Sequence, residues 1–363
     1  MRGGEKCLEA ILDIFPKAEV FTLFYEPEKI SSKINERSIH VHPISKFSII
    51  KKKYRNFIPL YPLIIGQWPN VSSFDFVISS SHCVSKSFNS GNLPHLCYCY
   101  SPMRYIWDMF DDYFLKDDVP LWKKTLMKCI RKPLQNWDKK SSQSVHQFIA
   151  ISKFIGKRIQ NCYEKESEVI YPFADLKYYH TSNVQREDHY LVVSALVPYK
   201  NIDVVVKAFN HSGRKLIIIG TGPEESALKK TANHNITFYG WAENQTIREH
   251  YHKAKAFIFP GVEDFGITPV EAMACGCPVI AYKKGGTCET VIDITVDPKN
   301  GTGLFYEKPN AESLNQSIEQ LESMNVKFSN AQLQKQASKF SVEKYREEMI
   351  LLVDRVLTSQ KQY

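Results

Sequence analysis

Short continuous apolar runs alternate with segments of helical periodicity along the second half of the chain. Runs of this kind are typical of strands buried on both faces, and the intervening helices supply the crossovers that parallel pairing requires. Strands are expected at 190–196, 215–220, 236–240, 256–260, 278–282 and 303–306, and helices at 201–211, 223–233, 243–254, 268–275 and 311–323. The pattern predicts a parallel sheet covered by helices on both faces, which is the Rossmann-like architecture.

The first half shows the same alternation with less regularity. Strands are expected at 19–25, 38–43, 74–80, 95–101, 146–152 and 168–172, and helices at 5–15, 103–114, 120–146, 154–163 and, broken at prolines, within 46–68. A polar, aperiodic linker follows Pro172. We therefore expect an α/β protein of two Rossmann-like domains. The first is residues 1–175 and the second is residues 176–341, and a last helix is expected within 342–363.

The chain opens on a segment that looks like the tail of a glycine loop, Met1-Arg-Gly-Gly-Glu5, and a helix follows at once. An α/β unit normally has a strand before such a loop, and none stands here. Loss of this strand would expose unpaired backbone groups in the sheet. We expect either that Met1 is not the natural start or that the first domain compensates for the missing strand in an unusual way.

The length of 363 residues exceeds a typical single core and fits two domains. No segment contains the ~20 apolar residues that span a bilayer, and the N-terminus lacks a secretory signal pattern, so a cytoplasmic protein is expected. The nine cysteines are scattered, without a CxxC motif or a Cys/His cluster. Buried free thiols in a reducing compartment are therefore favoured over a zinc site.

The net charge of +8 is concentrated in the first half. Residues 1–175 contain 25 Lys+Arg against 18 Asp+Glu, and residues 176–363 contain 22 against 21. Two runs interleaved with aromatic residues hold most of the excess: Lys51, Lys52, Lys53 and Arg55, and Lys123, Lys124, Lys128, Arg131 and Lys132. Such runs suit an anionic membrane surface, at ~1 kcal/mol per basic residue, and a solvated helix face is the alternative. Nucleic acid is not expected as a partner, because no nucleic-acid-binding motif accompanies the charge.

Two glutamates in the segment 257–286 are the leading candidates for site residues. Glu263 follows a buried strand in an acidic loop, where this architecture places its ligands. Glu271 lies eight residues later, in a helix that is expected to open at Thr268. Thr268-Pro-Val-Glu271 has the form of a capping box, so Glu271 has a structural explanation beside a ligand role. Glu263 has no such alternative.

Backbone amides beside these carboxylates form a second kind of binding group. The helix N-terminus and the N–H groups of Phe265, Gly266 and Ile267 favour an anion. Carboxylates accept hydrogen bonds from hydroxyl groups, whereas amides bind phosphate oxygens. A nucleotide sugar carries both hydroxyls and a diphosphate, and so satisfies both kinds of group.

The string GVEDFGITPVEAMACGCPVIA, followed by GGxxE, resembles the E-x7-E signature of the retaining GT-B glycosyltransferases of family 4. Other segments follow in that family's order: ISSSHCVSK, CYCYSPMRYIWD, FIAISKFIGKRI, VIYPFAD, VVSALVPYKNID and IIIGTGPE. The resemblance covers nearly the whole chain and is closest to the O-antigen and capsule mannosyltransferase branch. It implies a hexosyltransferase with two Rossmann-like domains that face each other across a cleft, and a C-terminal helix at 342–363 that returns to the first domain.

The resemblance assigns roles in the second domain position by position. It implies that Glu263 binds the donor sugar hydroxyls, that Glu271 binds the ribose hydroxyls, and that Lys200 and the helix-end amides contact the diphosphate. Taken alone, Lys200 is a basic residue just after a strand, so a surface position is its alternative. Gly222, in GTGPE, would shape the donor cleft, and this turn lacks the third glycine of a dinucleotide fingerprint.

In the first domain, the resemblance implies that the backbone at Gly4 approaches the donor phosphates. Arg104 and Trp107 resemble positions on the acceptor side. His82 is a further acceptor-side candidate, with a packed or capping histidine as its alternative. Tyr100 stands where relatives commonly carry histidine, and it is a candidate catalytic residue in a positioning role, because tyrosine cannot serve as a base at neutral pH.

The resemblance implies transfer with retention of the anomeric configuration, in surface polysaccharide synthesis. GDP-mannose is the favoured donor, and a glycan or polyprenyl-linked oligosaccharide is the expected acceptor, met in the cytoplasm or on the membrane face. Protein groups would stabilise the leaving nucleoside diphosphate, and no Asp-x-Asp motif occurs, so neither a metal nor a cofactor is expected. Two alternatives are a non-catalytic relative that still binds a nucleotide or glycan, and a nucleotide-sugar epimerase on the same architecture.

Overall fold

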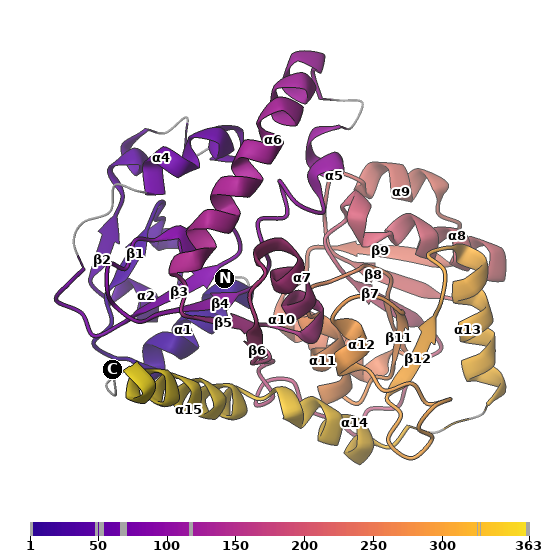
Figure 1. Ribbon diagram of the computed structural model, residues 1–363. Helices are drawn as coiled ribbons and strands as arrows, with labels where there is room; N and C mark the ends of the chain where they lie inside the picture. Colours follow the sequence, from indigo (N-terminus) through magenta and orange to yellow (C-terminus); the bar gives the residue numbers. More distant parts are fainter. Residues whose placement is uncertain are drawn as a thin grey trace. The chain divides into compact units, whose positions relative to one another are not determined.

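The computed structural model describes residues 3–47, 50, 54–65, 71–115, 119–324, 326 and 328–360. The chain divides into two compact units, the first formed by Met1–Tyr171 with Tyr345–Tyr363 and the second by Pro172–Lys344. Each unit consists of parallel strands with helices around them (Figure 1). The predicted α/β class with two Rossmann-like units is thereby confirmed.

Six parallel strands form the sheet of the second unit, in the order β12-β11-β10-β7-β8-β9. They are β7 (Tyr190–Val193), β8 (Leu216–Ile219), β9 (Ile236–Gly240), β10 (Phe257–Phe259), β11 (Val279–Tyr282) and β12 (Gly303–Tyr306). Each strand lies within the apolar run that predicted it. The pairing is in parallel register, with Leu191 opposite Ile217 and Ile258 opposite Ile280.

Alternate residues of these strands face the two sides of the sheet. On one side Val192 and Ile218 belong to a buried cluster with α8 (Ile202–Ser212) and α13 (Ala311–Ser323). On the other side Tyr251 of α10 (Asn244–Lys253) packs edge-on against Phe257, with ring centroids 5.4 Å apart. The remaining helices of this unit are η6 (Pro198–Lys200), α9 (Glu225–Thr231), α11 (Ile267–Ala274), α12 (Thr287–Thr290), α14 (Asn330–Ala337) and η7 (Ser338–Phe340).

The strands of the first unit form two separate parallel sheets. One pairs β1 (Val20–Thr22) with β2 (Ile39–Val41), and the other has the order β3 (Val77–Ser81), β4 (His95–Cys99), β5 (Gln147–Ala150) and β6 (Ser167–Val169). Within the described ranges no strand pairs with both β1 and β3. Aromatic packing joins the sheets instead, because the ring of Phe21 in β1 lies 5.9 Å from that of Phe74 and 5.7 Å from that of Phe88.

Helices of very different length surround these strands. They are α1 (Gly3–Ile14), η1 (Pro27–Lys29), α2 (Ser32–Asn35), η2 (Pro43–Lys46), η3 (Tyr54–Leu60), α4 (Tyr61–Ile65), η4 (Ser85–Ser87), α5 (Phe110–Phe114), α6 (Leu121–Ser141), η5 (Ser142–Ser144), α7 (Lys153–Tyr163) and, from Tyr345 on, α15 (Val342–Gln360). Tyr345 packs edge-on against Tyr98 of β4. Among the helices described, none combines the length and the apolar character needed to cross a bilayer.

One helical prediction in the first unit needs correction. Helix was expected over 103–114, but regular helix begins only at Phe110. The reason lies in α6, where Arg131 Nε and Gln135 Nε2 donate to the carbonyl of Ile106 at 3.1 and 2.8 Å, and Arg131 Nη2 donates to that of Trp107 at 2.7 Å. Side chains of α6 therefore bind carbonyls that a helix would use. The expectation for 46–68 lies partly outside the described residues, and the remainder is η3 followed by α4.

A buried ion pair connects α6 to η4. Lys86 and Asp138 are 1% and 0% exposed, and Lys86 Nζ lies 2.7 Å from Asp138 Oδ1. The same ammonium donates to the carbonyl of Asp138 at 3.1 Å and to Ser141 Oγ at 3.3 Å. Asp138 Oδ2 accepts hydrogen bonds from Trp107 Nε1 at 2.8 Å and from the Tyr163 hydroxyl at 2.9 Å. Buried charges persist only when they are paired and hydrogen-bonded, so this network fixes α6, α7 and the loop after β4 together.

Glu322 in α13 is expected to make the second unit sensitive to acid. It accepts hydrogen bonds from the Tyr190 hydroxyl at 2.8 Å and from Arg214 Nη2 at 2.7 Å. Burial acts to raise its pKa, but the hydrogen bonds from Arg214 and Tyr190 outweigh burial and lower the pKa from 4.5 to about 2. A carboxylate whose pKa is lower in the folded state contributes stability that is complete above the unfolded-state pKa and is lost as the pH falls through the folded-state pKa.

We therefore expect Glu322→Gln to lower the melting temperature at neutral pH. The variant should also lose less stability than the unchanged protein between pH 4.5 and about 2. Thermal unfolding across this window measures both effects, with Glu307→Gln, an exposed glutamate on the same unit, as the control. Equal slopes for Glu322→Gln and the unchanged protein would contradict the role of Glu322.

Candidate functional site

The order of the strands in the second unit reverses between β10 and β7. Open parallel sheets bind ligands at such a point, outside the carboxyl ends of the strands. Lys200 ends η6 after β7, and Glu263 follows β10. Their side chains form an ion pair between Lys200 Nζ and Glu263 Oε1, with 18% and 26% of the two side chains exposed. The structure thus brings together, at the point of reversal, the two residues predicted to contact the diphosphate and the sugar.

Backbone geometry next to Lys200 fixes its position. Asn201 is left-handed, with φ 55°, a conformation that asparagine adopts more readily than most residues. Its side-chain amide donates to the carbonyl of Pro260 at 3.2 Å. This hydrogen bond connects the loop after β7 to the end of β10, and so holds Lys200 beside Glu263.

The turn after β11 supports the loop that carries Glu263. The amide of Gly286 donates to the carbonyl of Glu263 at 2.8 Å, and Glu263 forms an isolated parallel bridge with Gly285. Further along the loop, Phe265 is 3% exposed and packs edge-on against Phe340, with centroids 5.4 Å apart. These contacts anchor the backbone of the loop while the Glu263 carboxylate stays partly exposed.

The helix α11 begins earlier than the sequence predicted. Its N-cap is Gly266, with φ 88°, so Thr268 is the second helical residue and the predicted capping box from Thr268 to Glu271 does not form. A glycine suits this left-handed position but offers no side chain to cap the helix. The first turn therefore presents backbone N–H groups that have no acceptor inside the helix, which is where an anion binds. The amides of Phe265, Gly266 and Ile267 lie at this helix start, as the prediction requires.

Glu271 is 8% exposed, in the second turn of α11. Burial is the main cause that raises the pKa of Tyr179 and of Tyr251, and the negative charge of Glu271 is the next cause for both. The carboxylate therefore lies within electrostatic range of these two phenols. Because the capping box is absent, capping no longer explains why a glutamate stands here.

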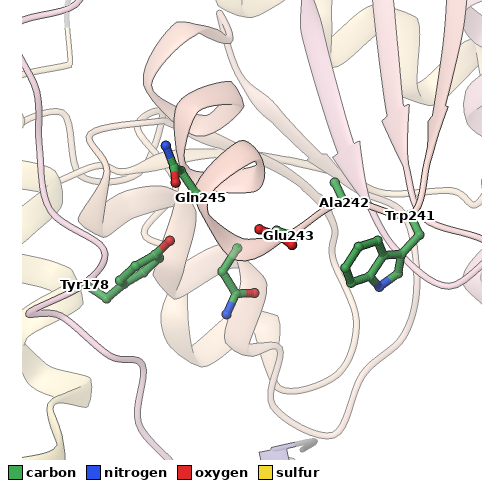
Figure 2. A pocket seen from close by; sticks show the side chains of 6 residues that line it. Tyr178, Trp241, Ala242, Glu243 and Gln245 are labelled. Atoms are coloured by element: carbon green, nitrogen blue, oxygen red, sulfur yellow. The ribbon is translucent and has the colours of Figure 1, made fainter.

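A pocket opens after β9, at a place where the sequence predicted no site. Its lining is Tyr178, Trp241, Ala242, Glu243, Asn244 and Gln245. Figure 2 shows Tyr178 and Trp241 on opposite sides of the pocket, with Glu243 between them. Trp241 is 71% exposed, although an indole normally buries most of its surface. The signal in the sequence was a large aromatic residue directly after a strand, at the ligand-binding edge of a parallel sheet.

Gly222 and Gly220 have a structural explanation at the end of β8. A Cβ atom at Gly222 would lie 2.2 Å from the carbonyl oxygen of Leu196, and one at Gly220 would lie 1.9 Å from that of Ser194. The turn after β8 thus packs so closely on the loop after β7 that only glycine fits. This contact sets the course of the loop that leads to Lys200, and the direct role of Gly222 toward a donor stays a prediction.

In the first unit, Tyr100 and Gly4 are hydrogen-bonded to each other. The Tyr100 hydroxyl donates to the carbonyl of Gly4 at 3.0 Å and lies 2.9 Å from Ser80 Oγ. Burial raises the pKa of the Tyr100 phenol well above its ordinary value. The phenol therefore remains protonated at neutral pH, and the positioning role of Tyr100 stays a prediction. The contact anchors the start of α1 at the carboxyl ends of β3 and β4.

The three residues predicted on the acceptor side occupy different environments. His82 is exposed, directly after β3. Arg104 is half-buried, with Nη1 3.9 Å from Met109 Sδ. Trp107 is also half-buried, and its indole N–H is bound to Asp138. The sequence did not predict this structural role of Trp107, because its partner Asp138 lies far away in the chain.

The arrangement in the second unit offers a cation, two carboxylates and the N–H groups of a helix start. In the described part of the chain, no three His, Cys, Asp or Glu side chains are grouped so that they could hold a metal ion. The nine cysteines are free thiols, but only five of them are buried, and Cys129 and Cys288 are exposed, so the prediction of buried thiols holds only in part. Chemically, this set of groups can bind phosphate oxygens and sugar hydroxyls at the same time.

Comparisons with known proteins agree with this chemistry. Residues 181–340 match the family "Glycosyl transferases group 1". A GDP-mannose-dependent monoacylated alpha-(1-6)-phosphatidylinositol monomannoside mannosyltransferase of Corynebacterium glutamicum is 33% identical over 144 residues, 35% of this chain and 36% of that protein. An O-antigen chain mannosyltransferase of Salmonella typhimurium is 30% identical over 160 residues, 40% of this chain and 42% of that protein. The chain thus spans less than half the length of these relatives.

A solved structure covers almost the whole chain. The crystal structure of Anabaena HepE in complex with UDP superimposes with a TM-score of 0.71 over 98% of this chain and 96% of that one, at 16% identity. A likeness at this identity shows the fold alone. The chain therefore has the GT-B fold, and its residues 181–340 match the glycosyl transferases group 1 family.

Proposed function

We propose that the protein is a retaining glycosyltransferase that moves a hexose from a nucleoside-diphosphate sugar to a glycan or lipid-linked oligosaccharide acceptor. The paired Lys200 and Glu263 carry this proposal, since they place a cation and a carboxylate together at the ligand-binding edge of the second unit. The cation suits a diphosphate, and the carboxylate suits sugar hydroxyls. The family domain that contains both residues supports transfer over binding alone.

The donor lies along the carboxyl edge of the second sheet in this proposal. Three strand spacings separate β10 from β9, about 14 Å at ~4.8 Å each, which a nucleoside diphosphate can span. The base enters the pocket beside Trp241, and the ribose hydroxyls bind Glu271. The diphosphate lies on Lys200 and the start of α11, and the hexose reaches Glu263.

Binding of the donor exchanges one partner of Lys200 for another. The diphosphate replaces Glu263 beside the ammonium, and the released carboxylate accepts hydrogen bonds from the sugar hydroxyls. When the bond between the anomeric carbon and the diphosphate oxygen breaks, Lys200 and the amides of α11 stabilise the charge on the leaving group. The acceptor hydroxyl forms the new bond from the same face and passes its proton to the leaving diphosphate oxygen, so the anomeric configuration is retained. Because protein groups stabilise the charge, the reaction requires no metal in this proposal.

Mannose from GDP-mannose is the donor we favour. Two relatives are mannosyltransferases by name, one GDP-mannose-dependent and one of an O-antigen chain. The latter supports an acceptor in surface polysaccharide synthesis, assembled on the cytoplasmic face of the membrane. In the first unit, the hydrogen bond from the Tyr100 hydroxyl to the Gly4 carbonyl holds the start of α1, and His82, Arg104 and Trp107 are the proposed acceptor-side residues.

A panel of nucleotide sugars, including GDP-mannose and UDP-glucose, tests this function. Release of the nucleoside diphosphate is measured with and without a mannosylated lipid acceptor, and the sugar product is identified by mass spectrometry. We expect release and transfer with GDP-mannose, and strong loss of both in Lys200→Met. Lys207→Met, at an exposed lysine of α8, is the matched control. Recovery of the intact nucleotide with an altered sugar would indicate an epimerase, and binding without release would indicate a non-catalytic relative.

Trp241→Ala is expected to weaken binding of the donor nucleotide. Stacking of a base on an aromatic ring contributes about 1–3 kcal/mol, so the Kd for GDP should rise by roughly 5-fold to 150-fold. Tyr239→Ala is the control, because Tyr239 lies in β9 close to Trp241 and is 51% exposed, but does not line the pocket. Titration calorimetry with GDP measures both variants. Equal affinity in Trp241→Ala and the unchanged protein would place the base elsewhere.

A further inference from the structure

The outer face of α6 exposes an apolar stripe next to a mixed stripe that carries two lysines. The apolar stripe, at helical spacing i, i+4, i+7 and i+11, is Trp122, Leu126, Cys129 and Pro133, and the adjacent stripe is Leu121, Thr125, Lys128 and Lys132. All eight residues are exposed. The largest apolar side chains are far from buried, with Leu121 76%, Trp122 69% and Leu126 46% exposed. An exposed apolar patch of this kind marks an interaction surface.

The opposite face of α6 performs the packing within the unit. Met127 and Leu134 belong to the buried core cluster of the first unit, and further along the helix Asp138 pairs with Lys86. Figure 1 shows the N-terminal turns of α6 projecting from the body of this unit. The exposed stripes at this end therefore contribute little to holding the first unit together.

The positive charge of α6 favours some classes of binding partner over others. The helix contains seven Lys or Arg residues and one acidic residue, Asp138, whose charge is buried against Lys86. A second copy of this face would bring two positive surfaces together, which is unfavourable. A nucleic acid would satisfy the charge but would leave two exposed leucines without an apolar partner. An anionic bilayer offers phosphates to the lysines and an apolar interior to Trp122, Leu121 and Leu126.

We infer that the outer face of α6 docks on an anionic membrane surface, with Trp122 and its apolar neighbours inserted at the headgroup level. Lys128 and Lys132 lie beside the apolar stripe and contact the lipid phosphates. Tryptophan suits this depth because its ring is apolar and its N–H is polar. The inference rests on the proposed function in one respect, since a lipid-linked acceptor would be met at this surface.

Vesicle binding tests the inference without reference to transfer. The full-length protein is sedimented with vesicles of phosphatidylcholine, either alone or mixed with phosphatidylglycerol, at low and high salt. We expect binding to the mixed vesicles only, weakened by salt. Lys128→Glu with Lys132→Glu should reduce binding by about tenfold or more. Lys335→Glu with Lys339→Glu, at exposed lysines of the second unit, makes the same change in net charge and should leave binding unaffected.

The apolar contribution is tested with Trp122→Ser, against Val296→Ser as the control at an 81% exposed residue of the second unit. Trp122→Ser should weaken binding and abolish the blue shift of tryptophan emission on addition of mixed vesicles. Equal binding to neutral vesicles, or unchanged binding in both α6 variants, would overturn the inference. Dimers in sedimentation that dissociate in Trp122→Ser would also overturn it, in favour of a second copy. Activity on a detergent-soluble acceptor is retained in the α6 variants if the proposed function holds, so the two proposals fail separately.

Discussion

Replacement of Glu263 by glutamine is expected to abolish sugar transfer while the protein stays folded. The carboxylate is partly exposed and pairs with Lys200, so its contribution to stability is at most about 1 kcal/mol. In the donor complex it is the group proposed to accept hydrogen bonds from the hexose hydroxyls as charge develops at the anomeric carbon. Loss of one such group typically lowers kcat by about a hundredfold to a thousandfold.

Initial rates of GDP release with acceptor present, together with thermal melts, measure these two effects of Glu263→Gln. Glu307→Gln is the matched control, since Glu307 also pairs with a lysine, at 2.6 Å from Lys283 Nζ, but lies outside the site. We expect Glu263→Gln to bind free GDP at least as tightly as the unchanged protein, because the diphosphate no longer has to displace a carboxylate from Lys200. Normal turnover in Glu263→Gln would refute the assigned site, and a collapse of the melting temperature would show that Glu263 is structural.

Removal of the Asp138 carboxylate is expected to destabilise the first unit strongly. Asp138→Ala leaves the ammonium of Lys86 buried at 1% exposure without its counter-charge. It also deprives Trp107 and Tyr163 of their acceptor. Breaking a buried pair from one side costs about 3–5 kcal/mol, which is a large part of the 5–15 kcal/mol that typically stabilises a domain.

Urea unfolding followed by tryptophan emission measures this loss, since four of the five tryptophans, including Trp107 and Trp137, lie in the first unit. Asp188→Ala, at an aspartate whose side chain is 78% exposed, is the control and should change little. The double variant Lys86→Met with Asp138→Leu should recover part of the loss, because no charge remains buried. A midpoint for Asp138→Ala equal to that of the control would mean that the pair does not stabilise the unit.

Much of the fold could be predicted because the strands of the second unit are buried on both faces. Leu191, Ile218 and Ile258 stand in continuous apolar runs, and such runs have few other ways to be buried. Predictions failed where long-range contacts decide local structure. The segment 103–109 has helical composition, but Arg131 and Gln135 of α6 bind its carbonyls. No local pattern reports such a contact.

The same difference between local sequence patterns and long-range contacts applies to the site. Lys200 and Glu263 were identified from their places after strands and from family resemblance, and the reversal of strand order explains why they meet. The capping box at Thr268 was wrong because Gly266 takes the cap position in a left-handed conformation that the sequence alone leaves open. The pocket beside Trp241 was missed because a single exposed aromatic residue carries no motif.

A crystal structure of the protein with GDP-mannose, or with GDP and mannose, tests the donor site most directly. We predict that Lys200 Nζ leaves Glu263 and lies within hydrogen-bond distance of a diphosphate oxygen. Glu263 should then contact hydroxyls of the sugar, Glu271 those of the ribose, and the guanine should lie beside Trp241. A nucleotide bound elsewhere, with the ion pair between Lys200 and Glu263 intact, would contradict the proposed site.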